Sequence, residues 1–462
     1  MTEVFSQQEL SEIFGMQVKS AVDDICIDSR VAKDGDLFVA LRGANNDAHD
    51  FVHQAFANGA ALAVIEKSVT GVDIDRLIPV ESSKKALLQL AKFNLSKCNG
   101  KYVGITGSVG KTTTKDMIRH LLAKNFAGEN QIYASRGNFN SQIGLPICAA
   151  TMPRCTKIGI FEMGMGAPGD ISRLLEVASP SVSVVTGICE AHLEFFDSVL
   201  GIAAAKSEIF ATKTSQEAAI VPADSPCEAF LRERALKCGV REVFSFGSSP
   251  SADARVIAHE YAGDHLSMEA EIFGKKVRYR INNANDANII NSLSAILAAH
   301  IAAGIPPAPL ADAMDSFSPS TRRGEWTLLR ERDILLMDDA YNACPTSMRL
   351  AIQSLSRHTT RRKILVMGDM LELGDAAVYY HENLSATVDR FGVDLVFACG
   401  RLSKFLFDNL MEGKKGAWGE NSSQIAERVL EEIRDGDGIL VKGSNSMAMN
   451  LVVEAIKKHV GR

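Results

Sequence analysis

The chain has no surplus of basic residues and no leader-like start. Its 462 residues include 50 Lys and Arg against 56 Asp and Glu, which gives a net charge of -6. A general nucleic-acid binder needs a basic surplus to displace the counterions of a phosphate backbone, so the charge balance argues against that class. The first residues, MTEVFSQQELSEIF, put no basic flank before an apolar core, and no signal peptide is expected.

Cysteine pairs at metal-binding spacing and long apolar runs are also missing. The nine cysteines are scattered and contain no Cys-x-x-Cys pair, so neither a disulfide framework nor a zinc knuckle is predicted. This cysteine usage fits a reducing, cytoplasmic compartment. The most apolar helix-like run, residues 289–305, is broken by polar residues such as Asn291 and His300, which indicates a buried helix and not a membrane span.

The sequence does contain a regular alternation of strand and helix patterns. It is too long for one hydrophobic core, and its length predicts about three domains. The alternation predicts an α/β protein with mostly parallel sheets, and only residues 254–281 indicate an antiparallel edge. Turn-rich stretches predict domains at residues 1–99, 100–317 and 318–462, with a hinge at residues 316–323.

Residues 101–116, KYVGITGSVGKTTTKD, have the pattern of a phosphate-binding loop between a strand and a helix. Gly107 and Gly110 allow a tight turn and a close approach of the backbone to a ligand. The unpaired N–H groups at the start of the helix, together with Lys111, favour an anion, and a threonine hydroxyl next to them can ligate magnesium. The general P-loop pattern has a glycine where this chain has Ile105, so a plain glycine turn before a helix stays open as an alternative.

Polar groups also follow other strands of the central part. Residues 138–140, Asn-Phe-Asn, and Glu162 come at the ends of two strands, and His192 follows a third. Ligands collect at the carboxyl ends of parallel strands. A carboxylate and an imidazole beside a phosphate loop therefore predict a divalent-cation site.

Lys206 is a further candidate, on a helix expected at residues 198–210. Each of these side chains has a plainer interpretation when taken singly. Lys206 could be a solvated lysine that pairs with Glu208, Glu162 could cap a helix, and His192 could be a structural hydrogen-bonding residue. The prediction of a site depends on the set.

These residues, in this order, resemble the Mur ligases, the ATP-dependent ligases that build the peptidoglycan stem peptide. The resemblance covers all three expected domains. The most specific runs are Asp-Asp-Ala-Tyr-Asn-Ala at residues 338–343 and Gly-Asp-Met-Leu-Glu-Leu-Gly at residues 368–374, which look like the members that add D-alanyl-D-alanine. The other matching runs are residues 28–30, 35–41, 106–114, 137–140, 143–146, 162–164, 191–194, 205–210 and 442–444.

The resemblance implies an ATP-dependent amide ligase. It would add D-alanyl-D-alanine to UDP-N-acetylmuramoyl-tripeptide through an acyl phosphate, in cytoplasmic peptidoglycan precursor synthesis. The fold it implies has a small N-terminal α/β domain for the UDP group, a central P-loop domain with a doubly wound sheet, and a C-terminal Rossmann-like domain. The expected partners are these small molecules, with no nucleic acid and no membrane span, and a monomer is expected.

The resemblance also implies roles for single residues. Lys111, His192 and Lys206 would be catalytic, and Ser29 and Arg30 would hold the UDP group. Lys206 would carry a CO2-derived carbamate, because an ammonium beside magnesium would repel the cation. Two magnesium sites are implied, with Thr112, Glu162, His192 and Lys206 as ligands. ATP would be bound by Gly107, Ser108, Val109, Gly110, Lys111, Thr112, Thr113, Asn138, Asn288, Arg323 and Asp339.

The chain departs from its relatives at four places. It has Ser141, Gln142, Ala48 and Asn445 where they usually have Asn, Glu, Gly and Arg, which affects substrate contacts more than the ATP site. The absence of an Asp-Asn-Pro-Arg motif argues against the diaminopimelate-adding member. Another Mur-type amino acid ligase, a folylpolyglutamate synthase-like ligase and, in another class, a nucleotide-regulated binding protein stay open as alternatives.

Overall fold

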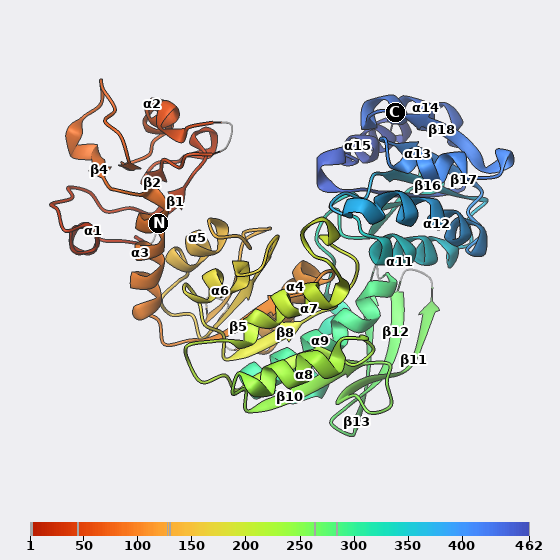
Figure 1. Cartoon of the computed structure of the whole chain (residues 1–462), viewed down its shortest axis with the longest axis horizontal. Coiled ribbons are helices and arrows are strands. Elements are labelled where there is room, and N and C mark those ends of the chain that lie inside the picture. The colour runs from red at the N-terminus through yellow and green to blue at the C-terminus, as the bar shows by residue number, and fades with distance from the viewer. Residues whose placement is uncertain are drawn as a thin grey trace.

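The computed structural model describes residues 3–43, 46–126, 128, 131–262, 265–282 and 285–461. Within these residues the strands form three sheets that follow one another along the chain, each packed against helices (Figure 1). The α/β class predicted from the alternation of patterns is confirmed. The proposed domain limits after residues 99 and 317 both lie between sheets, and we keep that division as a proposal.

The first sheet is small and parallel, in the order β1-β2-β3-β4. Its two central strands are buried along their whole length, as short apolar runs covered on both faces should be. Helix α3, Ser83–Ser96, leaves this part and contacts the next one, where Asn94 donates hydrogen bonds to the carbonyls of Ala149 and Met152. The strands are β1 (Asp24–Cys26), β2 (Asp36–Val39), β3 (Leu62–Ile65) and β4 (Leu77–Pro79).

The central sheet has the order β13-β12-β11-β10-β9-β8-β5-β7-β6. Strands β5 to β10 pair in parallel, while β11, β12 and β13 pair antiparallel, as the change of pattern at residues 254–281 predicted. The strands are β5 (Lys101–Thr106), β6 (Ile132–Ala134), β7 (Ile158–Glu162), β8 (Val182–Val185), β9 (Ala218–Pro222), β10 (Glu242–Gly247), β11 (Ala254–Ala262), β12 (His265–Ile272) and β13 (Lys275–Asn282).

The helices of the central part cover both faces of this sheet (Figure 1). The apolar run at residues 289–305 falls mainly in α9, Asp286–Ala303, whose residues are mostly buried, so the buried-helix interpretation is confirmed. Among the described residues, no helix is both long and apolar enough for a membrane crossing. The other helices are α4 (Lys111–Asn125), α5 (Gly144–Ala150), α6 (Asp170–Leu175), α7 (Val199–Lys206), α8 (Glu228–Lys237) and α10 (Pro307–Ala313).

One helix prediction needs correction. The α-helix expected at residues 198–210 ends at Lys206, and Ser207–Phe210 form a 3-10 turn. The Ser207 hydroxyl bonds to the Ala204 carbonyl, so a side chain competes for a backbone group at this point.

The third sheet has the order β14-β15-β19-β16-β17-β18 and is parallel except for β14. The two edge strands were not predicted, because they are mostly half-exposed and lack a continuous apolar run. The strands are β14 (Glu325–Leu329), β15 (Ile334–Asp339), β16 (Arg362–Gly368), β17 (Leu395–Cys399), β18 (Lys415–Gly419) and β19 (Asp437–Lys442). The helices are α11 (Pro345–Ser356), α12 (Ala377–Arg390), α13 (Ser403–Asp408), α14 (Ser422–Glu432) and α15 (Asn450–Val460).

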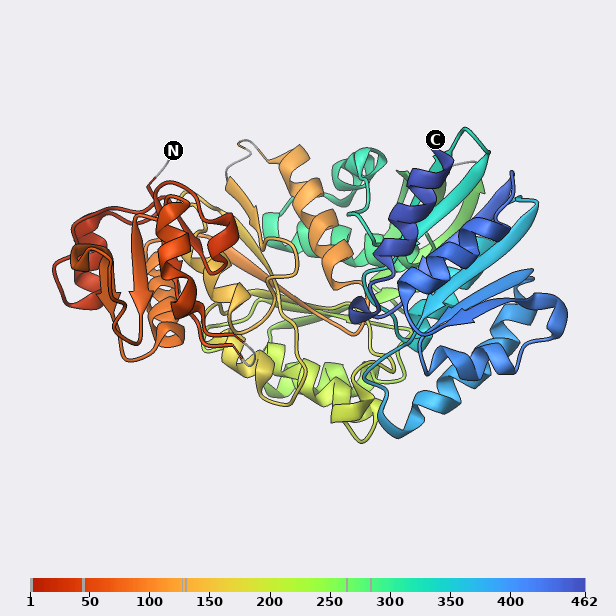
Figure 2. The same ribbon diagram turned by 90° about the horizontal axis from the view of Figure 1, so that it is seen from above.

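The first and third parts lie at opposite ends of the central part (Figures 1 and 2). The third part contacts the start of α9 through Asp286. The Ser354 hydroxyl accepts a hydrogen bond from the Asp286 N–H, and the Arg357 guanidinium pairs with the Asp286 carboxylate at 2.9 Å. The expected hinge, residues 316–323, runs between them, and Arg322 adopts a positive φ of 64° there.

Candidate active site

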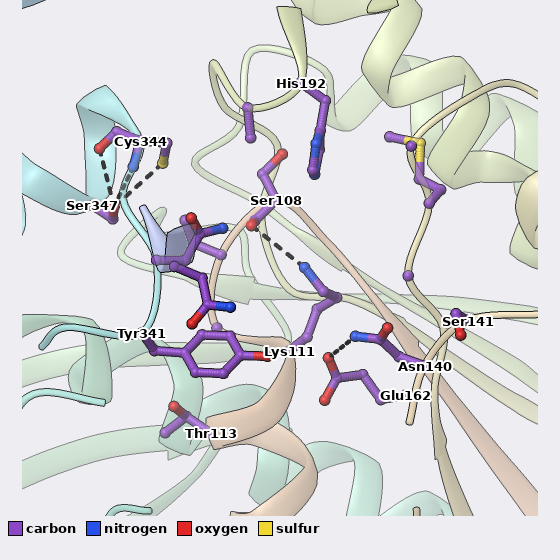
Figure 3. A pocket seen from close by; sticks show the side chains of 18 of the residues that line it. Ser108, Lys111, Thr113, Asn140, Ser141, Glu162, His192, Tyr341, Cys344 and Ser347 are labelled. Atoms are coloured by element: carbon purple, nitrogen blue, oxygen red, sulfur yellow. Dashed lines mark hydrogen bonds between the residues drawn. The ribbon is translucent and has the colours of Figure 1, made fainter. Parts of the chain in front are cut away.

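A cavity of about 1020 Å³ lies at the carboxyl ends of the central strands and is lined from all three parts of the chain. Lys84 and Lys85 reach it from α3, and residues 341–344 reach it from the third part. Figure 3 shows side chains from the two larger parts facing one another across this space. The residues expected from the sequence that line it are Ser108, Val109, Gly110, Lys111, Thr113, Glu162, His192, Asn288, Arg323 and Asp339.

The loop between β5 and α4 requires glycine at two positions. Gly107 has φ +151°, and a Cβ there would come within 2.0 Å of the Thr186 hydroxyl. Gly110 has φ +83°, and a Cβ would come within 2.4 Å of the Asn291 carbonyl oxygen. The backbone can therefore follow this path, with the first N–H groups of α4 unpaired, only without side chains at these places.

Lys111 stands at the first position of α4 and lies over the loop. Its amine donates to the Gly107 carbonyl at 2.6 Å (Figure 3 shows it among the cavity side chains). Burial lowers the pKa of Lys111, and the Glu162 carboxylate opposes that shift. A bound polyphosphate would supply the missing counter-charge, which makes the loop and lysine a fit for a nucleotide.

Glu162, at the end of β7, is the buried carboxylate of the site. It accepts from the Thr112 hydroxyl at 2.8 Å. It also accepts from the Asn140 amide at 2.7 Å (Figure 3). The interpretation of Glu162 as a helix cap is wrong, because its oxygens face these two groups. A hydroxyl and a carboxylate oxygen beside a phosphate loop are ligands that magnesium accepts, with phosphate and water completing its shell. In the part of the chain that is described, no group of three or more His, Cys, Asp or Glu side chains could hold a metal ion without such help.

His192 follows β8 in a loop and has φ 62°, which is uncommon for a residue with a side chain. Its Nδ1 lies 2.5 Å from a carboxylate oxygen of Glu372, which comes from the third part. His192 itself lines the cavity. The Glu372 carboxylate of the third part therefore holds the imidazole of the central part through its Nδ1 atom.

Lys206 ends α7 with a side chain that is almost fully buried and does not line the cavity. Burial, together with the charge of Lys111, lowers the pKa of Lys206 well below its usual range. The pairing with Glu208 is wrong, since Glu208 accepts from the backbones of Gly169 and Ser172. The charges that act on the Lys206 amine come from Lys111 and Cys189, and no carboxylate of the described residues is among them. The neutral amine is the form that reacts with CO2 to give a carbamate, and a lowered pKa favours that form.

The far wall of the cavity comes from α9 and the third part. Asn288 is 1% exposed, and its amide nitrogen has no hydrogen-bond partner among the described residues. Buried polar groups are usually hydrogen-bonded, so this nitrogen is available to donate to a ligand. The Arg323 guanidinium stacks at 3.5 Å over the ring of Tyr341. Asp339 pairs with the buried Lys442 at 2.5 Å, and burial raises the pKa of Asp339 while Lys442 opposes the rise.

Besides Gly107, Thr112 and Lys206, three more expected site residues do not line this cavity. Asn138 is in the turn that leads to Asn140, and its carbonyl accepts from the Asn140 backbone. Ser29 donates to Gln54 at 2.7 Å, and Arg30 is exposed and paired with Asp28 at 2.6 Å, both at the first sheet. The UDP role of Ser29 and Arg30 stays a prediction.

Sequence reasoning missed four residues that the structure brings to the site, namely Asn291, Tyr341, Glu372 and Lys442. Three of them stand inside runs used for the resemblance, which was a usable signal. Asn291 had none, because it lies in an apolar helix and its importance comes from contact with Gly110.

Family models match most of the chain. The Mur ligase middle domain matches residues 105–299, the glutamate ligase domain of Mur ligases matches residues 322–445, and the catalytic domain model of the Mur ligase family matches residues 22–94. A curated relative from Rickettsia prowazekii, named UDP-N-acetylmuramoyl-tripeptide–D-alanyl-D-alanine ligase, is 31% identical over 98% of this chain and 99% of its own length.

Solved structures agree with the family models. MurF from Acinetobacter baumannii superposes with a TM-score of 0.85 at 26% identity, covering 98% of this chain and 99% of that one. MurF ligase from Thermotoga maritima in complex with ADP gives 0.80 at 27% identity, covering 95% and 98%. The fold is thus that of these proteins.

Proposed function

The chain belongs to the Mur ligase family, and we infer that it joins D-alanyl-D-alanine to UDP-N-acetylmuramoyl-tripeptide with cleavage of ATP to ADP and phosphate. The observation that carries this conclusion is the match over almost its full length to a curated ligase of that name. The same specificity is indicated by the runs at residues 338–343 and 368–374, which line or border the cavity.

ATP use is supported by the site. The glycine loop and Lys111 are arranged for a polyphosphate, and Asn288 has an amide ready for a further contact. The relative solved with ADP has the same fold. We propose that Gly107 to Thr113 hold the phosphates, that Asn288 contacts the base, that Arg323 reaches the γ-phosphate and that Asp339 faces the ribose.

Magnesium fits beside Glu162 and Thr112, and we propose these residues as its ligands. When bound, the cation would add positive charge next to the phosphate oxygens. We assign His192 and a carbamylated Lys206 to a second magnesium. The buried amine of Lys206, on which no carboxylate of the described residues acts, supports the carbamate, because it would gain an anionic oxygen donor that the free lysine lacks.

The chemistry that the site supports has two steps. The terminal carboxylate of the tripeptide attacks the γ-phosphate of ATP, which gives an acyl phosphate and ADP. The amine of D-alanyl-D-alanine then attacks the acyl carbon, and phosphate leaves. Lys111 and the N–H groups of α4 would stabilise charge on the transferring phosphoryl oxygens, so the protein contributes position and electrostatics rather than a covalent nucleophile.

The substrates of this reaction are small molecules made in the cytoplasm, and we propose that location and a monomeric enzyme. A different Mur-type ligase would need another amino acid in place of the dipeptide. A nucleotide-regulated binding protein would have no use for a buried lysine and an imidazole next to the phosphate loop.

An ADP-release assay tests the function. ADP should form at a sustained rate only when ATP, UDP-N-acetylmuramoyl-tripeptide and D-alanyl-D-alanine are all present, and omission of either acceptor or dipeptide should reduce the rate to background. Sustained release with L-lysine, diaminopimelate or glutamate in place of the dipeptide would instead establish one of the rival ligases. Binding of ATP without any acceptor-dependent release would favour the binding protein.

A further inference from the structure

Two cysteines from different parts of the chain meet beside the phosphate loop. The sulfur atoms of Cys189 and Cys344 are 3.7 Å apart, and both side chains are buried together with Ala191 against Val109. Cys189 lies in the loop after β8, and Cys344 precedes α11. We propose that Cys189 and Cys344 form an oxidisable dithiol that a low-molecular-weight disulfide converts to a covalent bond between the central and third parts.

The geometry suits a disulfide. A bond requires the sulfur atoms to be about 2.05 Å apart, so they need to approach by roughly 1.7 Å. Neighbouring contacts hold the two segments in register, since Thr346 donates to Glu190 at 2.8 Å on one side of the pair and Glu194 donates its N–H to the Glu372 carbonyl at 3.1 Å on the other. The thiols therefore meet without a large movement of either part.

The two thiols also have different chemical character. Cys344 is the N-cap residue of α11, a position that favours a thiolate. The pKa of Cys344 is lowered, first by the Cys189 thiol that donates to it and then by Ser347, whereas the pKa of Cys189 is raised by the same contact and by burial. Cys344 is thus the attacking thiol and Cys189 the resolving one.

The exchange balances with one disulfide molecule. The Cys344 thiolate attacks a sulfur of R–S–S–R and releases R–S⁻, which leaves a mixed disulfide on Cys344. Cys189 loses its proton to the released thiolate and attacks the Cys344 sulfur, which releases a second R–S⁻ that takes a proton from solvent. Two protein thiols are oxidised by two electrons, and one external disulfide is reduced to two thiols.

An oxidant has a route to this pair, because Cys344 lines the cavity. The bond would also act on the phosphate loop. The Ser108 hydroxyl both donates to the Cys189 carbonyl and accepts from the Cys189 N–H, at 3.2 Å in each case. The disulfide would fix the central and third parts together and restrain this loop, so it should stop the opening that a multi-substrate ligase needs in each turnover.

The test uses the full chain, reduced, freed of reductant and then treated with oxidised glutathione. After alkylation of remaining thiols and digestion, a peptide pair joined through Cys189 and Cys344 should appear in the wild type and in the control variant Cys238→Ser, whose cysteine is exposed. The pair should be absent from Cys189→Ser and Cys344→Ser. Bound ATP should slow its formation, because nucleotide would occupy the cavity.

The functional readout compares each protein with its own untreated sample. Oxidation should lower sustained ADP release by about tenfold or more in the wild type and in Cys238→Ser, dithiothreitol should restore it, and both Cys189→Ser and Cys344→Ser should be spared. In solution scattering, the oxidised protein should no longer change its profile when ATP and both substrates are added.

Two outcomes would overturn the proposal. One is glutathione carried by Cys344, or modification of Cys238, without any bond between Cys189 and Cys344. The other is a quantitative bond with unchanged turnover and an unchanged scattering response. The bond between Cys189 and Cys344 is detected by mass and does not depend on the ligase activity. If the ligase assignment is wrong, ADP release with both substrates will be absent before oxidation, while the joined peptide pair will still form.

Discussion

His192 and Glu372 both adopt a positive φ of 62° and face each other across the joint between the central and third parts, with Nδ1 2.5 Å from the carboxylate. A backbone conformation of this kind persists in residues with side chains only where the surroundings impose it. The contact also lowers the pKa of Glu372, which favours the carboxylate form of that side chain. The third part therefore sets the orientation of an imidazole that belongs to the central site.

Substitution Glu372→Gln should reduce kcat by about tenfold or more, because an imidazole loses orientation when its carboxylate partner is replaced. The KM for ATP should change little, since Glu372 does not touch the phosphate loop. Steady-state kinetics with varied ATP separate the two effects. Glu412→Gln, at a side chain that is 89% exposed in the same part, is the matched control. Equal changes in the two variants would contradict a positioning role.

Substitution Lys111→Ala should lower ADP release by about 100-fold or more, because the charge beside the transferring phosphoryl group is lost. The melting temperature should not fall, since the buried ammonium has no anionic partner within hydrogen-bonding distance and its loss removes a desolvation cost. Lys124→Ala, on the exposed face of the same helix, controls for a general effect on α4. ADP release near the wild-type rate would show that the loop does not bind the reacting phosphates.

Lys206 should carry ¹³C when the protein is kept in ¹³C-bicarbonate. The lowered pKa leaves the amine neutral and reactive at lower pH than a surface lysine, and acidification should remove the carbamate by favouring the ammonium. A carbamate resonance should appear in the wild type and be missing in Lys206→Met. Activity should fall when CO2 is removed and recover with bicarbonate, whereas a bicarbonate-independent wild type would refute the modification.

Arg154 and Glu9 connect the first part to the central part, at 2.7 Å between a guanidinium nitrogen and a carboxylate oxygen. Hydrogen bonds from Arg154 lower the pKa of Glu9 below 4.5. The folded state therefore binds fewer protons than the unfolded state, so the stabilisation is complete above pH 4.5 and is lost as the pH falls through the folded pKa.

Arg154→Gln should accordingly lower the melting temperature near neutral pH. The difference in melting temperature between the variant and the wild type should shrink as the pH approaches 3. Calorimetry at several pH values measures this difference. Arg428→Gln, which breaks an exposed pair with Glu431, should show no such convergence. A difference in melting temperature that stays constant with pH would assign the effect of Arg154 to packing.

Much of the fold followed from local patterns. Continuous apolar runs predicted the buried strands, and the shift to alternation at residues 254–281 predicted the antiparallel edge. The strands that were missed, such as β14 and β18, lie at edges where half-exposed residues leave no apolar run. An edge strand forms because it pairs with a neighbouring strand, and its own residues do not specify that pairing.

For the site, the sequence by itself determined the glycine loop, Lys111, and the presence of Glu162 and His192 at strand ends, because strand order and glycine spacing are local properties. Only the tertiary structure decided which side chains meet. Asn291 approaches Gly110, and Glu372 and Cys344 contact the loop after β8, so each of these contacts joins residues far apart in the chain. The first depends on how α9 packs against α4, and the other two depend on how the central and third parts dock. Packing and docking are properties of whole surfaces, which no single stretch of sequence specifies.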